Sequence, residues 1–252
     1  KYDPKMAIKT LLNYSPNFNP KKRKTNQIKF LIFHYTGMRT EKAAIERLTD
    51  IKSRVSAHYL IKQNGEIITL VPDLYTAWHA GKSVWKNYSS LNKDSIGIEI
   101  VNPGHDINYK KFSIIQLAAL VKLSKFLIKK YRINSKNILG HSDIAPERKK
   151  DPGEKFPWKL LSKKKIGYWH NLNQNELIKN RNLKTSSKEK NLFLTNLFKI
   201  GYQKNFLYNS NFNHIRFDQI ISKAFQRRFR PEIINGKIDQ ECLLISQNLV
   251  KK

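Results

Sequence analysis

The sequence predicts an α/β fold with a mixed central β-sheet flanked by helices, followed by a small three-helix domain. Two observations lead to this expectation. Strand-like and helix-like segments alternate from about residue 28 to residue 141, as in proteins whose helices cover a sheet. Beyond about residue 190 the apolar residues recur only at helical spacing. The length of 252 residues fits one domain of ordinary size and a smaller one.

The first predicted strand covers residues 28–33, a nearly continuous apolar run of the kind that is buried on both faces of a sheet. His34 follows at its carboxyl end. The preceding residues up to Gln27 are basic and polar, and we expect them to form an irregular lead-in. No part of this lead-in has the apolar centre of a signal peptide.

A helix and a hairpin are expected next. Residues 41–50 carry apolar side chains at helical spacing. Two strand-like runs, 57–62 and 66–71, are joined through Asn64-Gly65, and this dipeptide strongly favours a tight β-hairpin.

Residues 95–101 alternate as a strand does, with three isoleucines on one face and Gly97 and Glu99 on the other. Ser113 and Gln116 then form a capping box that opens a helix. Its predicted buried face consists of Leu117, Leu120, Val121, Ser124, Leu127, Ile128 and Tyr131. Residues 138–140 are expected to form a short strand that leads directly into His141.

The polar composition of residues 163–190 predicts a linker or a loosely held connection. An amphipathic helix follows, with its apolar residues at Phe217, Ile220, Ile221, Ala224, Phe225 and Phe229. Asn235-Gly236 separates it from a final helix over 239–250. We therefore expect a catalytic domain over 1–183, which includes the lead-in and the linker, and a three-helix domain over 184–252.

The composition excludes several classes of protein. The single cysteine, Cys242, excludes an internal disulfide framework and a zinc site of several thiolates. No apolar run is long enough for a transmembrane segment. The net charge of +29 points to an anionic partner, but 37 of the 48 basic residues are lysines and no nucleic-acid-binding motif occurs. Specific nucleic-acid recognition is therefore not expected, and a solvated lysine-rich surface or attraction to another anionic polymer remains.

Three residues could hold a metal ion. His34 and His141 each follow a predicted buried strand, where ligands of α/β proteins gather. Asp151 precedes Pro152-Gly153, which favours an extended residue followed by a tight turn. Two imidazoles and a carboxylate are a usual protein contribution to a catalytic zinc. The three residues form no local motif, however, so purely structural roles remain open on spacing alone.

Two further residues fit such chemistry. Glu99 is expected on an internal strand, where a carboxylate is costly unless it is paired or catalytic. Gly97 beside it leaves room for an approaching group. Glu99 could act as a general base, while the alternative is an edge-strand carboxylate in solvent. Lys149 could stabilise an oxyanion, or it is one more surface lysine.

Five stretches of the sequence carry a family resemblance. They cover residues 33–37, 55–61, 77–81, 95–102 and 140–153. In this order they resemble the zinc-dependent N-acetylmuramoyl-L-alanine amidases of the AmpD/AmiD kind, relatives of T7-type lysozyme amidases and peptidoglycan recognition proteins. The C-terminal part resembles the peptidoglycan-binding module of AmiD-like members, and the best match lies at residues 224–231. The sequence therefore resembles the AmiD-like members more than the AmpD-like ones. The resemblance implies the T7 lysozyme-like amidase fold.

The resemblance also implies roles for individual residues. It makes His34, His141 and Asp151 the ligands of one Zn²⁺, Glu99 the catalytic base and Lys149 the oxyanion stabiliser. It implies substrate contacts for Tyr35, Trp78, His79, Asn102 and Arg148, and a structural or supporting role for His58. Phage-type relatives have a cysteine as third ligand and a tyrosine before the histidine that matches His58. Here Asp151 and Ala57 stand at these positions, which fits the Glu99-dependent branch.

The implied reaction is hydrolysis of the amide between the lactyl group of N-acetylmuramic acid, intact or 1,6-anhydro, and L-alanine of the stem peptide. The implied partner is peptidoglycan or a muropeptide. The implied location is the periplasm or cell envelope, with a cytoplasmic recycling enzyme as the alternative. A non-catalytic receptor on the same fold is the competing function. The sequence leaves open the oligomeric state and whether the C-terminal domain binds glycan or packs on the catalytic domain.

Overall fold

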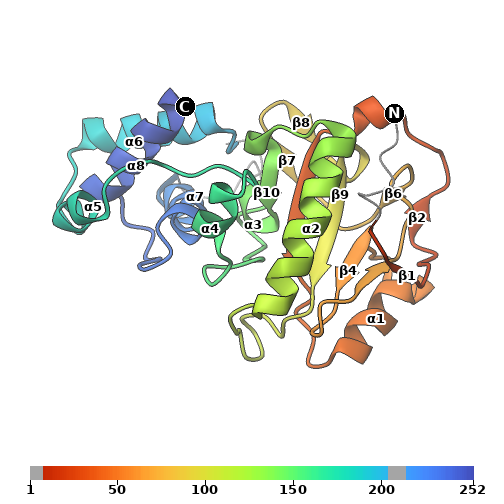
Figure 1. Cartoon of the computed structure of the whole chain (residues 1–252). Helices are drawn as coiled ribbons and strands as arrows, with labels where there is room; N and C mark the ends of the chain where they lie inside the picture. Colours follow the sequence, from red (N-terminus) through yellow and green to blue (C-terminus); the bar gives the residue numbers. More distant parts are fainter. Residues whose placement is uncertain (1–7, 204–213) are drawn as a thin grey trace.

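The computed structural model of the chain describes residues 8–203 and 214–252; residues 1–7 of the predicted lead-in lie outside the described part. A six-stranded sheet forms its centre, in the order β1-β5-β4-β9-β3-β10 (Figure 1). Its strands are β1 (Leu11–Leu12), β3 (Phe30–Tyr35), β4 (Tyr59–Ile61), β5 (Ile67–Thr69), β9 (Ser95–Ile100) and β10 (Ile138–Gly140). The sheet is mixed and carries helices on both faces, which confirms the predicted fold class.

Neighbouring strands of the sheet are parallel except β4 and β5, which form the antiparallel hairpin predicted at Asn64-Gly65. Gly65 has a φ of +82°, in the left-handed region that glycine adopts without a steric penalty. Strand β9 pairs with β4 on one side and with β3 on the other. Glu99 therefore lies on an internal strand, as predicted, and the alternative of an edge-strand carboxylate is wrong.

One face of the sheet is covered by α2 (Ile114–Tyr131), which begins at the predicted capping box of Ser113 and Gln116. The three isoleucines of β9 face this helix. The buried stripe of α2 differs in detail from the predicted one because Leu123 is fully buried. Three of the predicted apolar residues are only partly buried at its border: Leu117, Val121 and Ile128.

The opposite face of the sheet receives two groups of helices. Helix α1 (Glu41–Thr49) agrees with the predicted helix and packs Leu48 onto residues of β4 and β5. At the other side, Phe30 and Ile32 of β3 share one hydrophobic cluster with the C-terminal helices. Between these two groups the sheet face is open to polar residues.

The lead-in is more ordered than predicted. β1 pairs with β5, and β2 (Phe18–Asn19) pairs with β6 (Thr76–Ala77), so the prediction of an irregular segment is wrong. Two-residue strands are too short to show a period, which is why the sequence pattern did not indicate them. The remaining short elements are the hairpin of β7 (Val84–Trp85) and β8 (Tyr88–Ser89) and the 3-10 turns Thr25–Gln27, Ile51–Ser53, Leu91–Asp94 and Ser135–Asn137.

The C-terminal part is helical, as predicted. Its described helices are α6 (Ser187–Ile200), α7 (His214–Phe229) and α8 (Gln240–Lys251). Three shorter helices precede them: α3 (His141–Ile144), α4 (Trp158–Lys163) and α5 (Gln174–Asn180). The predicted linker over 163–190 is wrong in part because it contains α5. This helix is polar apart from Leu177 and Ile178, and it is held by the burial of Leu177 and by a 2.7 Å ion pair from Arg181 to Glu241.

The division at residues 183 and 184 stays a prediction. A single hydrophobic cluster runs across it, from Phe30 and Leu139 in the sheet to Phe193 and Phe225 in the C-terminal helices. The two parts therefore pack together through a common core. Among the described residues, no helix is both long and apolar enough to cross a bilayer.

Candidate active site

The site forms where the carboxyl ends of three parallel strands meet, on the sheet face opposite α2. The register pairs His34 of β3 with Glu99 of β9. On the other side of β3, Gly140 of β10 pairs with Phe33, so His141 follows at the level of His34. Because side chains alternate along a strand, His34 shares its face with Phe30 and Ile32. The side chains of His34, Glu99 and His141 therefore lie together at the carboxyl-end edge of the sheet.

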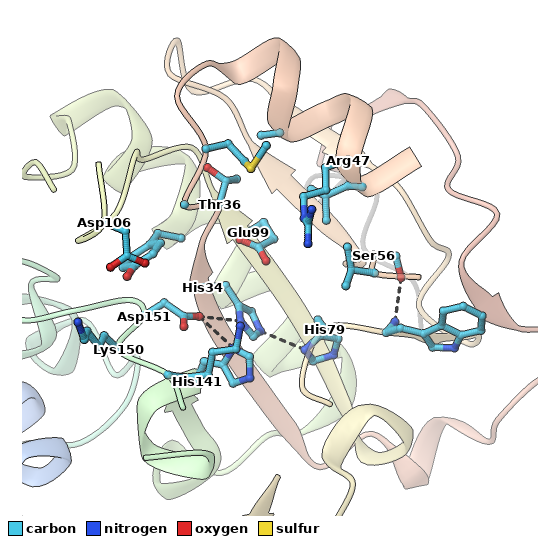
Figure 2. A pocket seen from close by; sticks show the side chains of 18 of the residues that line it. His34, Thr36, Arg47, Ser56, His79, Glu99, Asp106, His141, Lys150 and Asp151 are labelled. Carbon is cyan, nitrogen blue, oxygen red and sulfur yellow. Dashed lines mark hydrogen bonds and ion pairs between the residues drawn. The ribbon is translucent and has the colours of Figure 1, made fainter. Parts of the chain in front are cut away.

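Three buried side chains converge there (Figure 2). His34 Nδ1 lies 3.0 Å from both His141 Nδ1 and Asp151 Oδ2, and His141 Nδ1 lies 3.1 Å from the same carboxylate oxygen. The three residues are between 1% and 6% exposed. They could hold a metal ion, one ligand atom from each.

Asp151 reaches the site from a tied-down loop. Its carbonyl oxygen accepts a 2.8 Å hydrogen bond from the Ser142 amide, next to His141. Pro152 is fixed by a 2.7 Å hydrogen bond from the Tyr109 hydroxyl to its carbonyl. Gly153 has a φ of +85°, as expected for the tight turn. The carboxylate is therefore presented by a rigid backbone.

A hydrogen-bond chain sets which nitrogen of His34 can bind a metal. The Ser95 hydroxyl donates to the Leu91 carbonyl at 2.6 Å, so it accepts from His79 Nε2 at 3.2 Å. His79 Nδ1 is then the acceptor for His34 Nε2–H at 3.1 Å. His34 Nδ1 is left unprotonated, with its lone pair toward the other two ligands. Such partners of the far nitrogen orient metal-binding histidines.

His141 is oriented in the same way by the backbone. Its Nε2 lies 3.1 Å from the Ala80 carbonyl oxygen, which can only accept. Nε2 therefore carries the proton and Nδ1 offers its lone pair to the site.

Burial and charge put His34 and Asp151 in the protonation states that a metal requires. Burial and the nearby His141 lower the pKa of His34 to about 4, so this imidazole is neutral at pH 7. Burial alone would raise the pKa of Asp151, but His141 and the hydrogen bonds from both histidines outweigh it and lower that pKa. Two imidazoles and one carboxylate fit a zinc ion by the chemistry of the donors.

Glu99 is held next to His34 with an unsatisfied oxygen. Its Oε2 is buried and has no hydrogen-bond partner in the described part of the chain. Burial, followed by the charge of Asp151, raises the pKa of Glu99 to about 8, while Lys149 acts in the opposite direction. A carboxyl group with a raised pKa beside possible metal ligands is typical of a general acid-base residue.

These residues line a cavity of about 500 Å³ on the open part of the sheet face. Four cationic residues surround it: Arg47, Arg148, Lys149 and Lys150. Asp106 is the acidic residue that joins Glu99 and Asp151 in the lining. The cavity is large enough for a small peptide-sized ligand, and its rim favours one with negative charge.

One expectation about the site needs correction, and His79 has a role beyond the predicted one. His79 lines the cavity, as predicted, but both of its ring nitrogens are used by His34 and Ser95. The open space expected beside Gly97 is filled by the His79 ring, with which a Cβ at Gly97 would collide. Gly97 therefore admits a supporting histidine, and nothing from solution. His58 has the expected structural role, since its Nδ1 accepts from the Gly97 amide at 3.0 Å.

The other predicted contact residues differ in their positions. Tyr35 and Trp78 line the cavity, with Tyr35 Oη 2.9 Å from His105 Nδ1. Arg148 also lines it, but its guanidinium already donates to the carbonyls of Ala80 and Lys82. Asn102 lies outside the cavity lining, and its amide holds the loop at Lys110.

Sequence reasoning missed Ser95 and the Ala80 carbonyl, which set the tautomers, and Arg47 at the cavity rim. A serine that begins a strand and a backbone carbonyl carry no residue-type signal. Arg47 lies on the polar side of α1, where a solvated arginine looks the same in sequence.

Comparisons with known proteins show which family the chain resembles. A family model described as N-acetylmuramoyl-L-alanine amidase matches residues 24–154. The chain is 36% identical to N-acetylmuramoyl-L-alanine amidase AmiD of Escherichia coli over 239 residues, which cover 90% of this chain and 83% of that protein. It is 46% identical to 1,6-anhydro-N-acetylmuramyl-L-alanine amidase AmpD of Escherichia coli over 106 residues, 42% of this chain and 55% of that protein.

Two solved structures are similar over most of the chain. One is AmiD from Escherichia coli in complex with anhydro-N-acetylmuramic acid-L-Ala-D-gamma-Glu-L-Lys, with a TM-score of 0.77, 35% identity and 89% coverage of both chains. The other is AmpDh3 from Pseudomonas aeruginosa in complex with anhydromuramic pentapeptide, with a TM-score of 0.76 and 30% identity, covering 100% of this chain and 98% of that one.

Proposed function

The chain belongs to the N-acetylmuramoyl-L-alanine amidase family of amide hydrolases, and on this premise we propose a zinc-dependent mechanism for it. The substrate bond is the amide between the lactyl group of N-acetylmuramic acid and L-alanine of the stem peptide. The observation that carries the proposal is the convergence of His34 Nδ1, His141 Nδ1 and Asp151 Oδ2 beside the unpaired Glu99.

His34, His141 and Asp151 would hold the zinc ion, with both imidazoles oriented through their far nitrogens. A zinc ion in this position supplies Lewis-acid polarisation of the substrate carbonyl and lowers the pKa of water. Proton transfer, oxyanion stabilisation and substrate binding are carried out by side chains of the protein.

Glu99 acts as the proton carrier. Its carboxylate takes a proton from the attacking water, and the protonated acid then gives this proton to the departing amine of L-alanine. A pKa close to neutral suits both steps because the group must accept and release a proton at the same pH. The absence of a hydrogen-bond partner for Oε2 among the described residues leaves that oxygen available for water.

Lys149 places a positive charge at the cavity, where it stabilises the oxyanion that develops on the lactyl oxygen. Its influence on the pKa of Glu99 supports this proximity. The remaining cations of the rim, Arg47, Arg148 and Lys150, attract the free carboxylates of the stem peptide, and Tyr35 and Trp78 offer aromatic surfaces to the substrate.

We infer that the substrate includes muropeptides with a 1,6-anhydro sugar, because two similar structures hold such ligands. The net charge of +29 supports action on the anionic wall polymer as well, through long-range attraction that salt would weaken. Action on the wall polymer favours a location in the periplasm or envelope over the cytoplasm, and cell fractionation tests this directly.

The test of the proposed function is incubation with purified sacculi and with anhydro-muropeptides, each with and without a chelator. Mass spectrometry of the products identifies both the bond and the preferred substrate. We expect the release of intact stem peptides whose first residue is L-alanine. This release should stop when zinc is removed. Binding without any release would instead indicate a receptor, and release that persists after complete removal of metal would exclude the zinc mechanism.

A further inference from the structure

Strand β10 and helix α3, which meet at His141, are in contact with the C-terminal part of the chain. Asp143, two residues after His141, is a buried carboxylate with three donors. The Gly140 amide donates to it at 2.8 Å from within the same turn. The other two donors come from the C-terminal part: the Tyr202 hydroxyl at 2.8 Å and the Arg228 guanidinium at 2.5 Å.

Arg228 forms hydrogen bonds on both sides of His141 along the chain. Its Nη1 contacts Asp143, while its Nη2 donates to the Ile138 carbonyl at 2.9 Å, three residues before His141. The guanidinium also lies over the Trp158 ring, 4.2 Å from its centre. It is 2% exposed, so the contact is shielded from water and salt.

These contacts bridge about 60 to 90 residues of sequence. Tyr202 and Arg228 both lie in the region 184–252 that the sequence assigns to a separate domain, whereas Asp143 and Ile138 flank a metal ligand. The packing of α7 on α3 in the common hydrophobic cluster adds to the same connection. A fixed position of His141 is needed because metal sites tolerate only small errors in ligand geometry.

We propose that the C-terminal helices position His141 through Arg228, Tyr202 and Asp143, so that the metal site is complete only when these helices are docked. This inference rests on the proposed zinc site. Arg228 and Tyr202 are positioning residues here, since neither lines the active-site cavity. The C-terminal part then has a role in the active site itself, whether or not it also binds glycan.

Arg230 provides a matched control. It lies two residues further along and is 1% exposed. Its partners are Asp239 at 3.1 Å and Glu241 at 3.5 Å, both within the C-terminal part. Arg228→Lys and Arg230→Lys therefore make the same chemical change in the same buried environment, and only the first one affects the connection to His141.

The test measures zinc affinity by competition with a chromophoric chelator, together with kcat and KM, for the full-length variants. We expect Arg228→Lys to weaken zinc binding and to lower kcat by about 10–100-fold with little change in KM, as found for residues that orient metal ligands. Arg230→Lys should keep the zinc affinity of the wild type. Tyr202→Phe, which removes one hydroxyl and keeps the ring, should weaken zinc binding by about 10-fold.

Each outcome is decisive. Failure of the wild type to bind zinc would reject the proposed function. Tight binding by the wild type with equal affinity and kcat in Arg228→Lys and Tyr202→Phe would overturn the inference alone. A loss of zinc affinity in Arg230→Lys as large as in Arg228→Lys would also overturn it, because general packing would then be the cause. If Arg228→Lys does not fold, the zinc affinity and kcat of Tyr202→Phe decide whether the inference holds.

Discussion

Two buried polar clusters of this molecule, the cavity on the sheet and the contact with the C-terminal helices, are built on opposite principles. In the cavity, three atoms that could ligate a metal lie about 3 Å from one another, and Glu99 Oε2 has no partner among the described residues. At the contact, Asp143 faces Arg228, and within the C-terminal part Asp239 and Glu241 face Arg230. The buried carboxyl group at the cavity keeps an oxygen without a partner among the described residues, whereas the buried carboxylates among the helices face arginines.

The largest effect that we expect from a substitution in either cluster is a loss of activity at the cavity. Glu99→Gln removes the proton carrier, so kcat should fall by about 10²–10⁴-fold. Zinc content and the free energy of unfolding should not decrease, because Glu99 is neither a ligand nor a paired charge. Kinetics on an anhydro-muropeptide, metal analysis and urea denaturation check the three quantities. Loss of stability or of zinc in this variant would contradict the distinction between the two clusters.

The contact region should respond in the opposite way. Arg228→Met leaves Asp143 buried without its cationic partner, so the free energy of unfolding should fall by about 3–5 kcal/mol. Arg47→Met is the control, since it removes an exposed cation at the cavity rim and should change stability by less than about 0.5 kcal/mol. Equal stability of the two variants in urea denaturation would show that the buried pair has no structural importance.

Lys149→Met tests whether the rim lysine takes part in the chemistry. Removal of an oxyanion-stabilising group should lower kcat by about 10²-fold, with zinc affinity and folding unchanged. Lys150→Met alters the next residue of the same loop and should mainly raise KM. A loss of kcat that is the same in both variants would mean that the rim acts only through its total charge.

The raised pKa of Glu99 also predicts how stability depends on pH in the metal-free protein. The carboxyl group keeps its proton up to about pH 8 when folded, but only to about pH 4.5 when unfolded. The free energy of unfolding should therefore decrease between these values, by about 1.4 kcal/mol per pH unit. Glu99→Gln should lack this component, so the difference between variant and wild type should grow with pH. A constant difference would exclude the raised pKa.

The hydrophobic pattern correctly placed His34 and His141 directly after or at the end of buried strands and Glu99 on an internal strand. Their proposed roles, and that of Asp151, came from the family resemblance, because spacing alone left structural roles open. It did not predict the function of His79, since whether a histidine contacts substrate or another histidine depends on tertiary hydrogen bonds. The sequence did not predict the lead-in strands β1 and β2, because a strand of two residues shows no alternating pattern. The role of Arg228 escaped because an arginine in a basic helix has the same pattern whether it faces solvent or a buried carboxylate.

The central claim is that His34, His141 and Asp151 bind one zinc ion on which hydrolysis depends. It is tested most directly by titrating the metal-free protein with zinc and measuring stem-peptide release from an anhydro-muropeptide at each step. We predict that the rate rises linearly and reaches its maximum at one zinc per chain, and that His141→Ala shows no such rise. Full activity before zinc is added, or an equal rise in His141→Ala, would contradict the account.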